Sequence, residues 1–314
     1  MKTKRLGREG PELTVVGFGA WEAGGDDYGP NESIERVIAA IDEAIDAGMN
    51  WIDTAEVYGH GTSEELVGRT LDGRDEVLVA SKVAPKPSGS GFAPDEVRAA
   101  CEASLRRLGR DALDLYHLHW PAPDGPPVEE TWEAMAGLVE EGLVRHIGVS
   151  NFDRDLIERC LPIRHVDSLQ PEFSMLHPET RDLIRWCGDR GIGVVAYGPL
   201  GFGLLTGAVD MDTRFDDWRG DPEDEIWDRL FKPEKRSAAL AVVDALRPIA
   251  ERRRATVAQV ALAWTVHQDG VTSAIAGSRN PKHCRANAAA GDLELDGETL
   301  RKIEERVLPL GPEA

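Results

Sequence analysis

Short apolar runs alternate with longer amphipathic stretches along the whole chain. The runs are bounded by Gly, Pro, Asp or Asn, and several are rich in β-branched residues; they cover 15–19, 51–53, 77–81, 113–119, 147–150, 168–172, 193–197 and 271–276. Such runs are typical of strands buried on both faces, as in a parallel sheet. We therefore predict eight parallel β-strands.

The stretches between these runs carry apolar residues at helical spacing. In 32–47, the apolar residues from Ile34 to Ile45 fall on one face, and Gly48 ends the pattern. Further helices are predicted at 63–71, 94–108, 128–141, 154–161, 178–190, 237–253 and 281–289. Strands that alternate with helices pair in parallel, and eight of them favour a closed α/β structure, the (β/α)8 TIM barrel. No linker divides residues 1–314, so we expect a single domain.

Two segments fall outside the alternation. Residues 1–14 precede the first strand and are expected to form a hairpin that closes the bottom of the barrel. Residues 198–235, after the seventh strand, are longer than a connection needs, and loops of more than about 12–15 residues are usually functional or disordered. This loop follows the carboxyl end of a strand, where barrels of this type carry their chemistry.

A Rossmann dinucleotide-binding sheet is excluded by the first predicted strand. Such a sheet carries G-x-G-x-x-G directly after that strand, with an acidic residue about 20 positions later. The sequence here is GFGAWEAGG at 17–25, whose glycines do not form that motif. The barrel is therefore preferred to an open, doubly wound sheet.

The chain is strongly acidic. Its net charge is -20, its pI is about 4.8, and only eight of its 36 basic residues are lysines. This charge disfavours binding to nucleic acid or to an anionic membrane surface. Two explanations of the composition stay open: a GC-rich genome that favours arginine codons, and adaptation to high salt. A stability that is flat or falls between low and molar salt would count against the second.

Neither a signal peptide nor a membrane span is predicted. The sequence MKTKRLGREG at 1–10 has no apolar run after its basic residues, and no segment approaches the roughly 18 apolar residues that span a bilayer. The cysteines are far apart and form no CxxC pair, so we expect reduced thiols in a cytoplasmic protein and no metal site. They are Cys101, Cys160, Cys187 and Cys284.

Four polar residues stand at the ends of neighbouring predicted strands. Asp53 ends the second strand, Tyr58 lies in the loop that follows it, Lys82 follows the third strand, and His119 ends the fourth. Each residue alone has a structural explanation, such as a surface lysine or an aspartate that caps a turn. Together, on one rim of a barrel, they indicate an active site.

These residue types suit proton delivery to a carbonyl oxygen. A tyrosine hydroxyl is a weak acid with an ordinary pKa near 10, and an ammonium on Lys82 is expected to lower the pKa of Tyr58 by stabilising the phenolate. Asp53 would be the counter-ion of Lys82, and His119 would orient the carbonyl. The set suits carbonyl reduction if another group delivers hydride.

The sequence resembles the aldo-keto reductase superfamily over nearly its whole length. The matching motifs, in order, are GFGAW at 17–21, DTAEVYG at 53–59, SK at 81–82, LDLYHLHW at 113–120, GLVRHIGVSNF at 142–152, LQPEFS at 169–174, AYGPLGFGLLTG at 196–207 and IAGSRNPKHCRAN at 275–287. The resemblance implies a (β/α)8 barrel that reduces aldehydes or ketones to alcohols with NADPH or, less often, NADH. The family's catalytic tetrad falls on Asp53, Tyr58, Lys82 and His119, whereas His117 is expected to be structural.

The resemblance also implies where the cofactor binds. The nicotinamide carboxamide is expected to bind to Ser150, Asn151 and Gln170, and the nicotinamide ring is expected to stack on Tyr197. The pyrophosphate is expected along the start of the long loop, and other contacts near the first two strands; these residues are Gly198, Pro199, Leu200, Gly201, Gly203 and Leu204, with Gly19, Ala20, Trp21 and Asp53. The loop through 216–219 is expected to fold over the cofactor as a strap, with its carboxylates facing outward.

The adenosine end of the cofactor is expected at the start of the last barrel helix. The residues are Gly277, Ser278, Arg279, His283 and Asn287. Arg279 would offer a planar guanidinium to a 2′-phosphate, and Asn287 would read the adenine edge. In much of the family the residue matching His283 is Arg or Gln, and in some branches Gly277 is Lys. NADPH is the expected cofactor, and because of these two departures NADH is kept as the alternative.

Trp21, Tyr58, His119 and Trp120 are expected to line the substrate pocket, and the short tail after Val307 leaves that pocket open. Two alternatives to a reductase are kept. A cofactor-binding regulatory protein like the potassium-channel β subunits can retain the whole tetrad. A barrel isomerase or lyase acting on a phosphorylated substrate would bind no nicotinamide. For the reductase, the expected partner is a small-molecule carbonyl.

Overall fold

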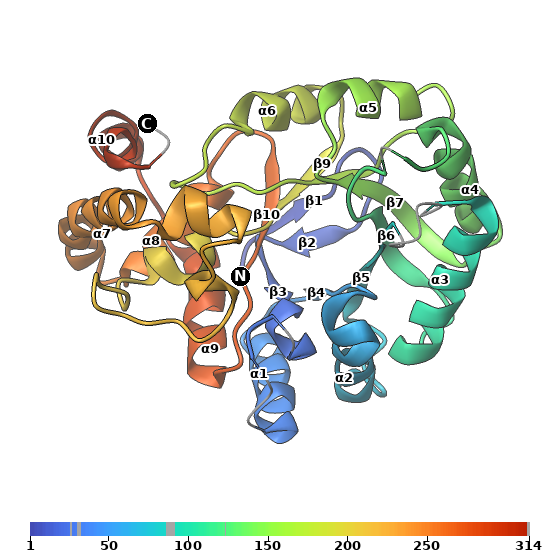
Figure 1. Ribbon diagram of the computed structural model, residues 1–314, viewed down its shortest axis with the longest axis horizontal. Helices are drawn as coiled ribbons and strands as arrows, with labels where there is room; N and C mark the ends of the chain where they lie inside the picture. The colour runs from blue at the N-terminus through green and yellow to red at the C-terminus, as the bar shows by residue number, and fades with distance from the viewer. Residues whose placement is uncertain (26, 30–32, 86–91, 123, 313–314) are drawn as a thin grey trace.

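The computed structural model describes residues 1–25, 27–29, 33–85, 92–122 and 124–312. Eight parallel strands close into a barrel in the order β10-β3-β4-β5-β6-β7-β8-β9, with helices around it (Figure 1). The strands are β3 (Val16–Gly19), β4 (Trp51–Asp53), β5 (Leu78–Val83), β6 (Leu113–Leu118), β7 (Val144–Ser150), β8 (Ser168–Gln170), β9 (Gly193–Ala196) and β10 (Val271–Ile275). Each overlaps one of the eight apolar runs, so the predicted (β/α)8 barrel is confirmed.

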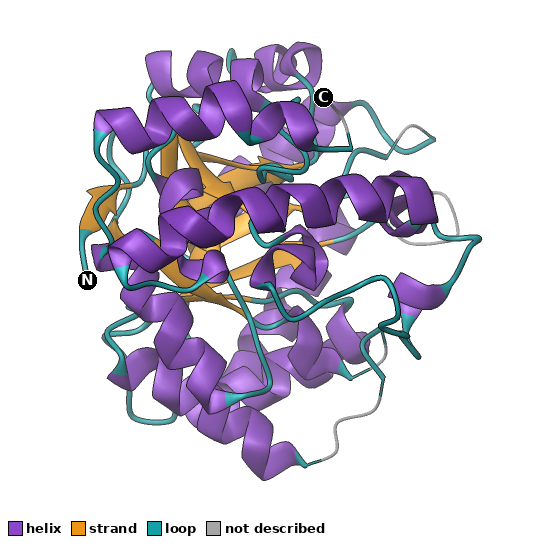
Figure 2. Cartoon of the chain, turned by 90° about the vertical axis from the view of Figure 1, so that its left-hand side faces the viewer, coloured by secondary structure: helices purple, strands orange, loops and turns teal. Residues whose placement is uncertain are grey.

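The strands are apolar because both of their faces are covered. Helices enclose the sheet from outside, as the side view shows (Figure 2), and every residue of β4 and β6 is buried. The helices are α1 (Ile34–Asp46), α2 (Thr62–Thr70), α3 (Pro94–Leu108), α4 (Val128–Glu140), α5 (Arg154–Cys160), α6 (Arg181–Asp189), α7 (Pro233–Arg253), α8 (Val257–Val266), α9 (Pro281–Ala289) and α10 (Gly297–Arg306).

The helices differ from the prediction in three places. The sequence pattern gave neither α8 nor α10, and α7 begins at Pro233, earlier than the predicted start at 237. Pro233 occupies the first turn of α7, where its missing N–H breaks no helical hydrogen bond. Residue 32, where the first helix was predicted to begin, lies outside the described residues, and α1 begins at Ile34.

The N-terminal hairpin closes one end of the barrel, as predicted. Its two antiparallel strands lie across the centre of the ring of strands in Figure 1. Leu6 and Leu13 are buried in one cluster with Trp51 and Leu115, which lie inside the barrel. The functional cleft must therefore open at the opposite end, where the strands have their carboxyl termini. The hairpin strands are β1 (Thr3–Arg5) and β2 (Glu12–Thr14).

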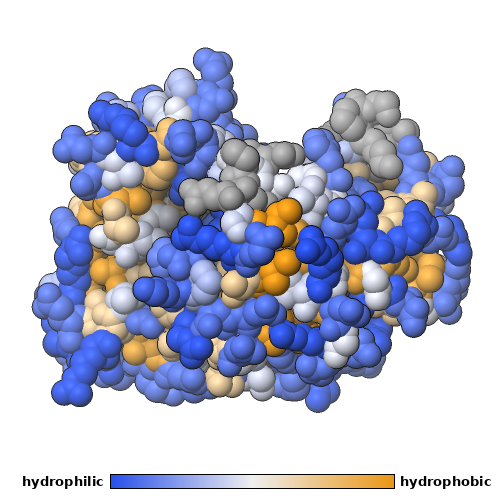
Figure 3. Space-filling view, turned by 90° about the horizontal axis from the view of Figure 1, so that it is seen from below, coloured by the Kyte–Doolittle hydropathy of each residue, from blue (hydrophilic) through white to orange (hydrophobic). Residues whose placement is uncertain are grey.

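One face of the molecule is drawn in Figure 3. It is largely hydrophilic, with small apolar patches between hydrophilic side chains. Among the described residues, no helix combines the length and hydropathy that crossing a membrane requires.

The four cysteines are free thiols and all are buried. Burial raises the pKa of each thiol to about 12, so all four are protonated and neutral at physiological pH. They lie on α3, α5, α6 and α9, on the sides of these helices that face the barrel.

Candidate active site

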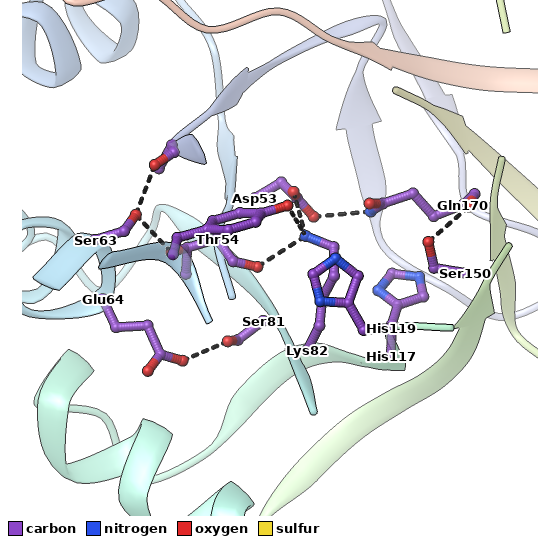
Figure 4. Close-up of polar contacts among 12 residues, drawn as sticks. Asp53, Thr54, Ser63, Glu64, Ser81, Lys82, His117, His119, Ser150 and Gln170 are labelled. Carbon is purple, nitrogen blue, oxygen red and sulfur yellow. Dashed lines mark hydrogen bonds and ion pairs between the residues drawn. The ribbon is translucent and has the colours of Figure 1, made fainter. Parts of the chain in front are cut away.

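Three of the four predicted catalytic residues lie side by side at the carboxyl ends of β4, β5 and β6 (Figure 4). Asp53 is paired in register with Ala80, so Lys82, two residues further along β5, points to the same side of the sheet. Lys82 is in turn paired with His117, and His119 lies one layer beyond. Lys82 is inside β5 because that strand continues to Val83, beyond its predicted end at 81.

The ammonium group of Lys82 connects the cluster. Its Nζ donates to Oδ1 of Asp53 at 2.6 Å, to the carbonyl oxygen of Thr54 at 2.9 Å and to Oη of Tyr58 at 3.2 Å. These three bonds use all three ammonium donors, as a fully buried lysine requires. Burial lowers the pKa of Lys82, while the carboxylate of Asp53 acts in the opposite direction.

Tyr58 is held by a close contact between two short turns of helix, η1 (Trp21–Gly24) and η2 (Tyr58–Gly61). Gly59 has a φ of 59°, and a Cβ built on it would lie 2.1 Å from the carbonyl oxygen of Gly24. Only glycine permits this approach, which places the ring of Tyr58 against the ring of Trp21, 6.1 Å away between centroids.

The pKa of Tyr58 does not follow the prediction. Burial, followed by the carboxylates of Asp53 and Asp27, raises it well above its ordinary value, whereas we expected Lys82 to lower it. In this structure Tyr58 therefore holds its proton as a neutral phenol. Lys82 donates to the phenol oxygen, and this contact would favour the phenolate once the proton has left.

His119 and His117 are both neutral in this site. Burial, followed by the charge of Lys82, lowers the pKa of His119 well below its ordinary value and that of His117 to about 3. His119 borders the cleft, with its ring 5.7 Å from that of Tyr58, whereas His117 is fully buried and contacts Ser168. The predicted difference between the two histidines agrees with their positions.

Amide and hydroxyl groups line the cleft next to the cluster. Gln170 donates from Nε2 to Oδ2 of Asp53 at 2.8 Å. Asn151 donates to the carbonyl oxygen of His119 and accepts a hydrogen bond from the hydroxyl of Tyr197 at 2.9 Å. Ser150 donates to the backbone of Gln170. The predicted carboxamide-binding groups thus form one network with the predicted catalytic residues.

Most of the predicted site residues line one cleft, which has a volume of about 1020 Å³. Those on its wall are Gly19, Trp21, Asp53, Tyr58, His119, Trp120, Ser150, Asn151, Gln170, Tyr197, Gly198, Pro199, Leu200, Gly203, Gly277, Ser278, Arg279, His283 and Asn287. Four predicted residues are buried behind this wall: Ala20, Lys82, Gly201 and Leu204. Lys82 itself does not line the cleft, and its side chain is hydrogen-bonded to Asp53 and Tyr58, which do.

The wall of the cleft near Arg279 also contains two polar residues, Glu22 and Asn280, that we did not predict from the sequence. Glu22 accepts a hydrogen bond from the backbone N–H of Arg279 at 3.2 Å. The guanidinium of Arg279 donates to the carbonyl oxygens of Tyr28 and Gly29. Asn280 caps α9 through its side chain. No sequence motif connects Glu22 with Arg279; the closing pair β3 and β10 brings them together.

The long loop folds over the cleft next to Trp21. The ring of Trp218 is stacked on that of Trp21, with centroids 5.9 Å apart, and Phe202 meets both rings edge-on. Arg219 pairs with Asp217, whose side chain is largely buried. The expectation that the carboxylates of the strap face outward is therefore wrong for Asp217. The strap is thus seated on the aromatic wall of the cleft. The loop contains η3 (Gly201–Thr206), η4 (Trp218–Gly220) and the π-helical turn η5 (Trp227–Phe231).

A second buried ion pair lies behind the cluster and was not predicted. Glu64 on α2 accepts from Arg107 on α3 at 2.6 Å. It also accepts from the hydroxyl of Ser81 at 2.5 Å (Figure 4). Like the carboxylate of Asp53, its charge acts against the lowering of the pKa of Lys82 by burial. Because Ser81 directly precedes Lys82 on β5, this pair supports the strand that carries the lysine.

The donor set of the cleft fits a nicotinamide dinucleotide. A carboxamide needs both donors and acceptors, and Ser150, Asn151 and Gln170 supply them beside an aromatic ring, Tyr197. Gly198 and Gly203 also line the cleft, and their backbone is left-handed, with φ of 65° and 104°. This conformation can expose N–H groups to phosphate oxygens.

Comparison with known proteins agrees with this geometry. Residues 15–307 match the sequence profile described as the Aldo/keto reductase family. The NADH-specific methylglyoxal reductase of Escherichia coli K12 is 33% identical, over 97% of this chain and 99% of its own. Aldo-keto reductase YhdN of Bacillus subtilis 168 is 32% identical, over 100% of this chain and 97% of its own.

Solved structures give the same result. The glycerol dehydrogenase AKR11B4 from Gluconobacter oxydans superposes with a TM-score of 0.86 at 29% identity, covering 99% of this chain and 96% of that one. An aldo/keto reductase from Klebsiella pneumoniae, in complex with NADP and acetate, superposes with a TM-score of 0.76 at 32% identity, covering 98% and 96%. The chain therefore belongs to the aldo/keto reductase family.

Proposed function

We propose that this protein reduces aldehydes or ketones to alcohols, with Tyr58 as the proton donor. The observation that carries the proposal is the contact of one buried ammonium, that of Lys82, with both Asp53 and Tyr58. A buried cation beside a phenol that faces a cleft stabilises the phenolate that forms when the phenol gives up its proton. Relatives that bind NADP, and one that is NADH-specific, support a nicotinamide cofactor.

Tyr58 provides the acid. Its pKa is raised by burial, so the phenol is protonated at neutral pH, and the proton passes from Oη to the carbonyl oxygen of the substrate. The phenolate that remains lies 3.2 Å from Nζ of Lys82, whose charge offsets the new negative charge. Asp53 keeps that ammonium in place, because a buried cation without a counter-ion would be strongly unfavourable.

His119 orients the carbonyl. A neutral imidazole donates one hydrogen bond, and the lowered pKa of His119 keeps the ring in that form. Its Nδ1 has no hydrogen-bond partner among the described residues, so the ring is held by packing against Tyr58 and Trp120. When bound, the nicotinamide cofactor supplies the hydride that the carbonyl carbon accepts. Trp21, Tyr58 and Trp120 surround the substrate end of the cleft.

The test is a substrate panel with matched tyrosine variants. Purified protein is mixed with a set of aldehydes and ketones and with NADPH or NADH, and consumption of the reduced cofactor is followed. Loss of a positioned general acid typically costs about 10²–10⁴-fold, so we expect a fall of that order in kcat for Tyr58→Phe. The control is Tyr116→Phe, on β6 outside the wall of the cleft, which should keep the wild-type rate.

Cofactor affinity separates the proposal from its alternatives. Tyr58→Phe should bind the dinucleotide as tightly as wild type, since only the proton donor is removed. Binding without turnover of any carbonyl would instead favour a regulatory protein. A wild-type protein that binds neither dinucleotide would contradict the proposal and favour a barrel enzyme of another class.

A further inference from the structure

Glu22 places a carboxylate on the wall of the cleft, beside residues that we expect at the adenosine end of the cofactor. It follows β3 directly and lines the cleft together with Ser278, Arg279 and His283. Its Oε2 accepts from the backbone N–H of Arg279 at 3.2 Å. That N–H lies two residues before the first residue of α9, a region where exposed N–H groups favour an anion. In this structure the carboxylate of Glu22 is the anion at this N–H.

The cationic groups near Glu22 are already engaged within the protein. The guanidinium of Arg279 donates to two backbone carbonyls, at 2.6 and 3.0 Å, and that of Arg219 pairs with Asp217. The ring of His283 is 3.3 Å from the hydroxyl of Ser278. Burial raises the pKa of Glu22, and the charges of Arg279, Arg219 and His283 act against that rise. Burial outweighs these charges, so the pKa of Glu22 stays raised, while the N–H of Arg279 and the nearby cations partly offset the cost of a negative charge there.

We propose that Glu22 is a cofactor-selecting residue, whose carboxylate disfavours the 2′-phosphate that distinguishes NADPH from NADH. This inference rests on the proposed function. A 2′-phosphate would compete with Glu22 for the N–H of Arg279 and would bring like charges together. The free 2′-hydroxyl of NADH is instead a hydrogen-bond donor, and a carboxylate accepts only. Glu22 therefore weakens the binding of NADPH and leaves that of NADH nearly unchanged.

The test replaces the carboxylate by an amide of the same shape. In Glu22→Gln the side-chain oxygen still accepts from Arg279, and only the charge is lost. Dissociation constants of NADPH and NADH are measured without substrate, by quenching of tryptophan fluorescence. We expect the Kd for NADPH to fall about tenfold, which corresponds to about 1.4 kcal/mol, and the Kd for NADH to change less than about threefold.

Two further measurements isolate the 2′-phosphate and the charge. Adenosine 2′,5′-bisphosphate and AMP lack the nicotinamide, so competition by these two compounds should show the same selective gain. Glu43→Gln is the matched control: Glu43 on α1 pairs with Arg285 on α9 and is not part of the cleft wall. It removes an equal charge next to the same helix and should leave the ratio of the two Kd values unchanged.

The outcomes distinguish this inference from the function on which it rests. If Glu22→Gln and Glu22→Ala shift both dinucleotides equally, or neither, the selecting role is overturned while carbonyl reduction stands. An equal shift in Glu43→Gln would also overturn it, because the effect would then belong to net charge. If the wild-type protein binds neither dinucleotide, the proposed function fails together with the inference.

Discussion

The side-chain amide of Gln170 and the ammonium of Lys82 donate to opposite oxygens of the same carboxylate, that of Asp53, at 2.8 and 2.6 Å. Gln170 comes from β8 and Asp53 from β4, so the bond crosses the interior of the barrel. Because Nε2 of Gln170 is used in this bond, its Oε1 is left to accept from a ligand. Gln170, which lines the cleft, thus also fixes the counter-ion of Lys82.

Loss of this bond should affect both stability and cofactor affinity. In Gln170→Leu, Oδ2 of Asp53 remains buried without its donor, a change that typically costs about 1–3 kcal/mol. We expect a decrease of that size in the free energy of unfolding, measured with urea, together with weaker dinucleotide binding. The control is Gln268→Leu at the end of α8, where solvent replaces the lost bond. Equal losses in the two variants would contradict the role of Gln170.

The ion pair between Asp53 and Lys82 should show strong coupling. Removal of one partner of a buried pair typically costs about 3–5 kcal/mol because the other charge remains unpaired. We expect Asp53→Asn to lose about that much unfolding free energy, since Lys82 is fully buried. The double variant Asp53→Asn/Lys82→Met removes both charges and should be more stable than Asp53→Asn alone. Simple additivity of the two single changes would show that the pair is not coupled.

The two histidines near Lys82 should make stability depend on pH. The pKa of His117 is lowered to about 3 and that of His119 falls well below its ordinary value. Below about pH 6.5 the unfolded chain therefore binds two protons that the folded protein does not, and the free energy of unfolding falls as pH drops. For each ring the expected slope is about 0.7 kcal/mol per pH unit near pH 6.5 and approaches about 1.4 kcal/mol per pH unit near pH 5.

Variants assign this slope to the buried rings. His117→Asn should remove about half of it, whereas His60→Asn should leave it intact because His60 is exposed. Asparagine is also suited to residue 60, where φ is 52°. Urea unfolding at a series of pH values gives the slope. If both substitutions leave it unchanged, the pH dependence comes from other groups.

The sequence predicted the barrel because strands buried on both faces have a simple signature. Helix α8 has the opposite property: all of its residues except Ala258 and Gln259 are buried, so it has no polar face to mark it as a helix. Helix α10 is amphipathic, with Ile303 buried and Leu300 packed against the core, but it follows the last strand and helix of the alternation from which the helices were predicted. Amphipathic periodicity identifies helices at an interface between core and solvent, and α8 is not of that kind.

The candidate catalytic residues could be predicted because each one stands at or near the end of a strand. The contacts that position them could not, since they join distant parts of the chain. Glu22 and Arg279 are 257 residues apart in sequence, and Asp53 and Gln170 are 117 apart. The pKa of Tyr58 was mispredicted for a related reason: the sequence suggested the cation beside it but not the extent of its burial.

The burial of all four thiols has a consequence for a protein that handles carbonyl compounds. Aldehydes are electrophiles, and thiolates are the side chains they modify most readily. With pKa values near 12 and no exposed sulfur, Cys101, Cys160, Cys187 and Cys284 offer almost no thiolate to such attack. In the folded protein, covalent modification at cysteine by an electrophilic carbonyl compound is therefore disfavoured.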